Sequence, residues 1–99
     1  SVTNPPVVPN APTSLTATAQ KKLRIQLAWK DNANNETGFK VERSVGGVTW
    51  TEIATLGANV TSYTSTGLTA GTTYSYRVRA YNAAGNSAYS NTASAKAVR

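Results

Sequence analysis

Apolar and polar residues alternate along short stretches of the chain, and this period of two is typical of β-strands. Residues 23–29, LRIQLAW, are the clearest example, because every second side chain is large and apolar. No stretch keeps the period of an amphipathic helix. The pattern predicts strands in the following ranges: 14–19, 23–29, 38–45, 48–56, 61–68, 72–82 and 88–98.

Turn-forming residues separate the predicted strands. Residues 31–38, DNANNETG, concentrate Asn, Asp and Gly, which favour turns. Gly46-Gly47 joins two extended runs across two residues, the length and chemistry of a tight hairpin with a primed turn. About seven short strands in about 90 residues predict an all-β, antiparallel, immunoglobulin-like β-sandwich. An up-and-down barrel is the less favoured alternative.

The longest predicted strand, residues 72–82, interleaves aromatic with basic side chains. Alternation turns one set of these side chains toward the core and the other toward solvent. We therefore predict that Arg77 and Arg79 lie on the outer face, across from Glu42 on the neighbouring strand. Exposed cross-strand ion pairs contribute only about 0.2–1 kcal/mol each, so we expect solvated arginines with little structural effect.

Inward-facing positions of the strands predict one core between two sheets. Its expected members are large apolar or aromatic residues, and a buried tyrosine needs a hydrogen-bond partner for its hydroxyl. The predicted structural core comprises Trp29, Phe39, Val41, Leu68, Tyr74, Tyr76 and Val78.

Chain length and proline content predict the domain organisation. Ninety-nine residues suit a single domain with one core. The opening stretch SVTNPPVVPN holds three prolines, which lack the N–H of a sheet ladder and favour extended chain. We predict a proline-rich linker over residues 1–10 and one domain over 11–99. No apolar run reaches the ~20 residues of a transmembrane helix, so we expect no membrane partner.

Catalytic chemistry has few candidate residues. Cysteine and histidine are absent, which excludes disulfides, thiolate or imidazole metal sites and Ser/His/Asp or Cys/His machinery. A glycosidase requires two carboxylates about 5–10 Å apart across a cleft, and a small sandwich leaves little room for one. We predict no catalytic residue and no cofactor, although four acidic residues are present: Asp31, Glu36, Glu42 and Glu52.

The segment DNANNE, residues 31–36, is the only candidate for a calcium loop. Ala33 occupies the third ligand position, and Glu36 stands where such a loop requires glycine. Asn side chains that cap their own turns explain the segment without a metal. Two N-x-Ser/Thr sequons, at Asn35 and Asn59, would matter only in a glycosylating host.

Charge and surface aromatics leave two binding hypotheses. The net charge is +6, but the ten Lys and Arg residues are spread along the chain, so we expect no specific nucleic-acid partner. Trp50, Tyr81 and Tyr89 occupy outer or loop-proximal positions and are the candidate carbohydrate contacts. Such a contact would be weak and shallow. Packing of Trp50 over the edge of the sandwich is the alternative, because single surface aromatics are common.

Over residues 11–98 the chain resembles a fibronectin type III domain. The strongest feature is the tyrosine-corner pattern of Leu68, Gly71 and Tyr74, in which the Tyr74 hydroxyl would bond to backbone a few residues upstream. Ala70 stands where the family often has proline. The remaining matching features are Pro12, Leu15, Ile25, Leu27, Trp29, GFKVERS, Tyr63 and RVRAYNAAGNSAYS.

The resemblance implies a non-catalytic accessory or spacer module. DNANNETGFKVERS is similar to modules of secreted bacterial chitinases and cellulases, which implies an extracellular location and neighbouring domains of the same chain as partners. We expect a monomer. The alternative is a weak polysaccharide-binding or protein-binding adhesion module. Residues 83–87 read AAGNS where some animal members carry the Arg-Gly-Asp motif, so integrin recognition is not implied.

Overall fold

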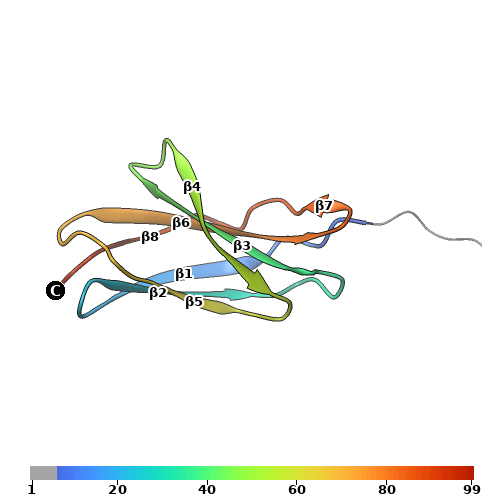
Figure 1. The fold of residues 1–99 in the computed structure, drawn as a ribbon, viewed down its shortest axis with the longest axis horizontal. Helices are drawn as coiled ribbons and strands as arrows, with labels where there is room; N and C mark the ends of the chain where they lie inside the picture. The colour runs from blue at the N-terminus through green and yellow to red at the C-terminus, as the bar shows by residue number, and fades with distance from the viewer. Residues whose placement is uncertain (1–6) are drawn as a thin grey trace, which may run out of the picture.

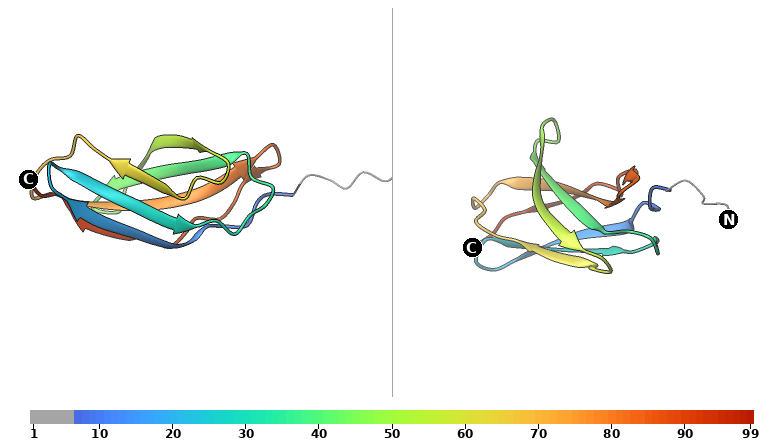
Figure 2. Two further views of the ribbon diagram at one scale, coloured as in Figure 1. Left: turned by 90° about the horizontal axis from the view of Figure 1, so that it is seen from below. Right: turned by 45° about the vertical axis from the view of Figure 1, so that its right-hand side comes forward.

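The computed structural model describes residues 7–99 and shows two antiparallel sheets packed face to face (Figure 1). One sheet has the order β1-β2-β5, and the other has the order β4-β3-β6-β7 with β8 also paired to β6. Figure 2 shows the two sheets as separate layers. The predicted all-β sandwich is confirmed. The strands are β1 Thr13–Gln20, β2 Arg24–Lys30, β3 Gly38–Val45, β4 Trp50–Gly57, β5 Ser62–Ser65, β6 Thr73–Asn82, β7 Gly85–Asn86 and β8 Ala93–Lys96.

The structure has one strand more than the predicted seven, because β7 is a two-residue strand that pairs with the end of β6. The last predicted strand, 88–98, is regular only within β8. Before β8, the side chains of Ser87 and Ser90 accept hydrogen bonds from the backbone N–H groups of Ala80 and Val78, at 2.9 and 3.0 Å. Serine hydroxyls thus take the place of strand carbonyls, so this segment follows β6 without a regular ladder.

The β3–β4 connection is longer than the predicted two-residue turn. Ser44 is the last residue of β3 to pair with β4, opposite Trp50, and residues 46–49 connect the two strands. Gly46 and Gly47 both have positive φ angles, +82° and +74°, as the sequence suggested for a tight bend. Separately, a β-bulge shifts the register of the β3–β4 pairing between Val41 and Glu42. The hairpin projects away from the sandwich (Figure 1).

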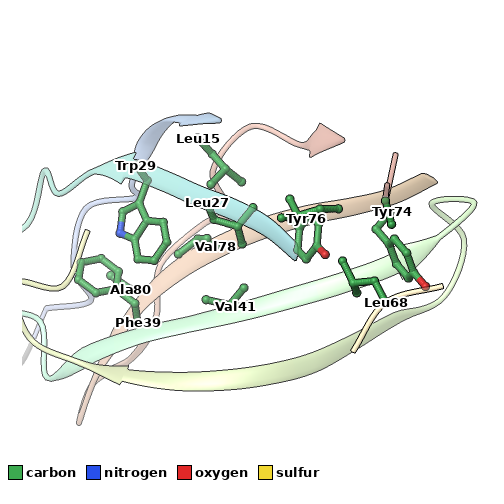
Figure 3. Close-up of a cluster of buried hydrophobic side chains, with 12 residues drawn as sticks. Leu15, Leu27, Trp29, Phe39, Val41, Leu68, Tyr74, Tyr76, Val78 and Ala80 are labelled. Atoms are coloured by element: carbon green, nitrogen blue, oxygen red, sulfur yellow. The ribbon is translucent and has the colours of Figure 1, made fainter. Parts of the chain in front are cut away.

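The core lies between the sheets and includes every residue of the predicted structural core. Trp29 and Phe39 meet at one end of it, with ring centroids 5.8 Å apart, and Leu68 and Tyr74 lie at the other end (Figure 3). Buried apolar surface of this kind is the main favourable contribution to folding. The buried hydrophobic residues are Leu15, Ile25, Leu27, Trp29, Phe39, Val41, Leu68, Tyr74, Tyr76, Val78, Ala80 and Ala97.

Both buried tyrosine hydroxyls have hydrogen-bond partners. The backbone N–H of Thr69 donates to the Tyr74 hydroxyl at 2.9 Å, which confirms the predicted tyrosine corner. The Tyr76 hydroxyl donates to the hydroxyl of Ser65 at 2.9 Å in the buried interior. The polar ends of these two rings are therefore satisfied without water.

Asn91 joins the edges of the two sheets. Its side-chain oxygen accepts the N–H of Leu15 at 2.8 Å, and its amide donates to the Leu15 carbonyl at 2.9 Å. Leu15 lies in an irregular part of β1, where the register with β2 shifts between Thr13 and Thr16. A side chain thus supplies the pairing that this bulge removes from the ladder.

The chain enters and leaves the sandwich at opposite ends of its long axis (Figure 1). Residues near Val7 lie at one end and the C-terminus lies at the other. Part of the predicted linker, residues 1–6, falls outside the described residues. Over residues 7–99, the structure contains no helix long and apolar enough to cross a membrane.

Candidate functional site

The three candidate carbohydrate contacts lie on the outer face of the larger sheet. Trp50 is the first residue of β4, Tyr81 lies near the end of β6, and Tyr89 lies in the segment between β7 and β8. All three side chains are partly buried. The outer face follows from alternation, because Arg77, Arg79 and Tyr81 alternate along β6 with the buried residues Tyr76, Val78 and Ala80.

Two of these rings are in contact with one guanidinium group. The centre of the Arg77 guanidinium lies 4.3 Å from the Trp50 ring centroid and 3.7 Å from that of Tyr89. The guanidinium of Arg79 also lies over Tyr89, at 4.8 Å. Each such cation–π contact contributes on the order of 0.5–2 kcal/mol, depending on its burial. Tyr81 is separate from this group and lies 5.0 Å from the Lys40 ammonium.

A buried carboxylate connects the arginines with Tyr89. Arg77 donates to one oxygen of Glu42 through Nε at 2.9 Å and lies 2.8 Å from it through its terminal nitrogen. The Tyr89 hydroxyl donates to the other oxygen at 2.8 Å, and a terminal nitrogen of Arg79 lies 3.5 Å from that same oxygen. The Glu42 side chain is only 8% exposed. The outer-face cluster therefore comprises Glu42, Trp50, Arg77, Arg79 and Tyr89.

The expectation that Arg77 and Arg79 are merely solvated is wrong. Their side chains are 25% and 23% exposed, respectively, and both pair with the same buried carboxylate. Alternation correctly assigns these residues to the outer face, but it does not show that Trp50 and Tyr89 cover that face. Sequence reasoning placed Glu42 opposite Arg77 and missed the contact with Tyr89, which is distant along the chain.

The electrostatics of the outer-face cluster favour the ionised form of Glu42. Burial alone raises the pKa of Glu42, because a buried charge loses its hydration. Hydrogen bonds from Tyr89 and Arg77, together with the positive charges of Arg77 and Arg79, outweigh burial and hold the pKa below 4.5, its ordinary value. For Tyr89, burial and then the hydrogen bond to Glu42 raise the pKa of the phenol.

This lowered pKa predicts how acid affects stability. A carboxylate with a depressed pKa in the folded state stabilises the fold above its unfolded-state pKa of about 4.5, and this contribution is lost as pH falls through the lower folded value. We expect wild type to be more stable than Glu42→Gln at pH 7, and the gap to narrow below about pH 4.5. Urea unfolding of both proteins from pH 7 to pH 2 measures this. A gap independent of pH would contradict it.

The acidic residues do not form a catalytic or metal-binding group. The carboxylate of Asp31 accepts the N–H of Ala33 at 2.9 Å in a local turn, and that of Glu36 accepts the N–H of Asn59 at 3.3 Å. Over the described part of the chain, no three acidic side chains gather as metal ligands, and no pocket is present. The outer face therefore presents aromatic rings and cationic side chains on a surface without a pocket in the described part of the chain.

Comparisons with known proteins agree with this architecture. The model of the fibronectin type III domain family matches residues 10–96. The chain is 41% identical to part of chitinase A1 of Niallia circulans over 91 residues, which is 89% of the chain. It is 39% identical to part of exoglucanase B of Cellulomonas fimi over 80 residues, or 79% of the chain. Among solved structures, the β-1,2-glucanase of Parabacteroides distasonis superposes with a TM-score of 0.82 at 28% identity over 95% of the chain.

The chain matches only a small part of each of these enzymes. It spans 12% of the chitinase, 7% of the exoglucanase and 14% of the glucanase chain. Domains of this kind thus occur within larger glycoside hydrolases, in which other parts of the chain make up most of the protein.

Proposed function

The chain belongs to the fibronectin type III domain family, and from this we propose that it is a spacer module of a secreted, multidomain, polysaccharide-degrading enzyme. Fibronectin type III domains are typically non-catalytic, and the chain has that fold. In this proposal the module occupies residues 11–99, residues 1–10 form a linker, and the sandwich holds neighbouring domains at a set separation. Its partners are then the domains before and after it in the same extracellular chain.

The observation that carries this proposal is the position of the two ends of the sandwich. The chain enters at one end of the long axis and leaves at the other (Figure 1), so neighbouring domains would be separated by the length of the module. Hydrophobic side chains fill the space between the sheets. On the outer face of the larger sheet, the outer-face cluster links neighbouring strands through ion pairs. A folded module of this kind fixes the relative orientation of the domains on either side of it better than a flexible linker does.

A chimaera of chitinase A1 of Niallia circulans tests the spacer function. The matched segment of that enzyme would be replaced either by residues 11–99 or by a Gly/Ser linker of equal length. We expect the module to keep activity on insoluble chitin and the flexible linker to lower it severalfold, because a flexible linker does not hold domains at one spacing. Release of soluble product over time measures the rate.

A soluble chitin oligosaccharide is the control substrate for both chimaeras. Both should hydrolyse it at the rate of the parent enzyme, because hydrolysis of a soluble chain does not depend on domain spacing. Equal activity of the two chimaeras on insoluble chitin would contradict the spacer function.

A second candidate function is weak binding of polysaccharide by the outer face. It is supported by the placement of Trp50, Tyr81 and Tyr89 on one face of the larger sheet, beside Lys40. Aromatic rings next to hydrogen-bond donors are suited to the apolar faces and hydroxyls of sugars. The contacts of Trp50 and Tyr89 with Arg77 weigh against it, because they already cover part of each ring.

Replacement of Trp50 distinguishes between the spacer function and the polysaccharide-binding function. If the module only spaces domains, Trp50→Ala should leave retention on chitin and cellulose unchanged while lowering stability by about 1 kcal/mol through loss of the contact with Arg77. Pull-down on insoluble polymer and thermal unfolding measure the two effects. Val48→Ala, which changes a side chain 87% exposed at the tip of the β3–β4 hairpin, is the control. Loss of retention in Trp50→Ala alone would favour the binding function.

A further inference from the structure

The N-terminal leader, residues 7–12, lies against one end of the sandwich. Pro9 and Pro12 are buried there. The leader adjoins the loop formed by residues 31–37 and the β6–β7 turn, which lie together at this end (Figure 1). Residues 7–10 were predicted to belong to a linker, yet they contact the folded domain.

The carbonyl of Val7 accepts two hydrogen bonds from different parts of the fold. The side-chain amide of Asn35, in the loop before β3, donates to it at 3.0 Å. The side-chain amide of Asn82, at the end of β6, donates to it at 2.8 Å. A carbonyl oxygen has two lone pairs, so both acceptor positions of Val7 are occupied. This carbonyl is therefore held from two directions.

Asn82 also connects the leader to the loop of residues 31–37 and to the β6–β7 turn. Its amide lies 3.2 Å from the carbonyl of Asn35, so its two N–H groups can serve Val7 and Asn35. Its side-chain oxygen accepts the N–H of Ala84 at 2.8 Å, which fixes the amide in the turn. The loop, the turn and the leader thus share one side chain.

Asn32 makes a second attachment farther along the leader. Its amide donates to the carbonyl of Ala11 at 3.1 Å and to the hydroxyl of Thr13 at 2.8 Å. The side-chain amide of Asn10 donates in return to the backbone carbonyl of Asn32 at 3.2 Å. The leader is therefore attached at both of its ends, by asparagines that lie three residues apart in DNANNETG.

The β6–β7 turn also leaves space for a leader side chain. A Cβ atom at Gly85 would lie 3.4 Å from a methyl carbon of Val8, within van der Waals contact, so the leader packs closely over this glycine. Gly85 has a φ of +139°, a conformation that other residues rarely adopt. The backbone conformation of this turn thus favours glycine, and Val8 of the leader lies against it.

We propose that Asn32, Asn35 and Asn82 form a carbonyl clamp that sets the direction in which a preceding domain enters the module. The three asparagines are positioning residues for the spacer function, on which this inference rests. They bind the leader mainly at its backbone carbonyls and through neutral amides, so the clamp depends little on salt. It assigns a role to DNANNETG beyond that of a turn.

Distance measurements between two spin labels test the clamp in the 99-residue chain. The absence of cysteine allows specific labelling of Val7→Cys and Thr66→Cys, both at exposed positions. Val7→Cys keeps the backbone carbonyl. Thr66 directly follows β5, and the β5–β6 connection lies toward the end that holds the C-terminus (Figure 1). Pulsed electron–electron double resonance should give one narrow distance distribution for the otherwise unchanged chain.

The decisive variant is Asn35→Asp with Asn82→Asp. Aspartate keeps the side-chain oxygen that accepts the Ala84 N–H and removes the amide donors to Val7. We expect the distance distribution to broaden at least twofold in this double variant. Asn34→Asp adds one negative charge to the same exposed loop, as the single variant Asn35→Asp does, and should leave the distribution narrow, because the Asn34 side chain makes no hydrogen bond with the described residues.

Three results would overturn the clamp: a broad distribution in the otherwise unchanged chain, a narrow one in the folded double variant, or equal broadening in Asn34→Asp. Circular dichroism verifies folding, and the single variants Asn35→Asp and Asn82→Asp give the same comparison if the double variant unfolds. The outcome is independent of the chitinase chimaera. A failed clamp leaves a spacer with a flexible entry, whereas a failed chimaera leaves the measured attachment of the leader intact.

Discussion

Replacing Glu42 with alanine is expected to lower the free energy of unfolding by about 3 kcal/mol, because it leaves two partly buried arginines without their carboxylate. Arg77 and Arg79 are each about one-quarter exposed, so water offsets part of the loss, and we place the effect at the lower end for a broken buried ion pair. The hydroxyl of Tyr89 also loses its acceptor. Urea unfolding at pH 7 measures the change.

Glu52→Ala is the matched control for this prediction. Glu52 pairs with Glu42 across β3 and β4, but it is exposed, and its carboxylate accepts only the Thr55 hydroxyl among the described residues. Its removal should change stability by no more than about 0.5 kcal/mol. Similar effects of the two substitutions would show that the outer-face cluster contributes no more than ordinary surface charge.

Replacing Tyr74 with phenylalanine is expected to lower the free energy of unfolding by about 2 kcal/mol, because the N–H of Thr69 loses its acceptor in a partly buried site. The same hydrogen bond lowers the pKa of Tyr74, since it favours the phenolate oxygen as an acceptor. Thermal and urea unfolding of Tyr74→Phe against wild type measure the loss.

Tyr63→Phe provides the comparison. Tyr63 lies in β5, packs against the core, and its hydroxyl makes no hydrogen bond within residues 7–99. Its substitution removes the same atom without breaking a hydrogen bond between described residues and should alter stability by less than about 0.5 kcal/mol. A loss in Tyr63→Phe as large as that in Tyr74→Phe would mean that the tyrosine corner contributes nothing specific.

The outer-face cluster and the carbonyl clamp have complementary consequences for a spacer. The cluster joins β3, β4 and β6 with the segment before β8 across one face of the larger sheet. The clamp joins the leader to the loop before β3 and to the end of β6. In the proposed spacer, we expect them to restrict motion within the body of the module and at its entry, the two places where flexibility would loosen the spacing between domains.

The sequence by itself determined the architecture of this protein. The period of two is a local property, and it placed Tyr74, Tyr76 and Val78 on one face of β6, where all three are buried. The tyrosine corner was implied by the resemblance to the fibronectin type III family at Leu68, Gly71 and Tyr74, and its hydrogen bond is also local, spanning five residues. Features that depend on residues close together in the sequence could therefore be predicted from the sequence.

Tertiary structure alone decided which polar residues act together. Alternation assigns Arg77 to the outer face, but its contact with Tyr89 depends on how the segment before β8 crosses that face. DNANNETG reads as a turn, and only the folded chain shows two of its asparagines bound to the leader, 28 and 21 residues away. A period of two specifies the face of a strand, whereas contacts between outer positions are set by sheet order, register and loop path, which are non-local.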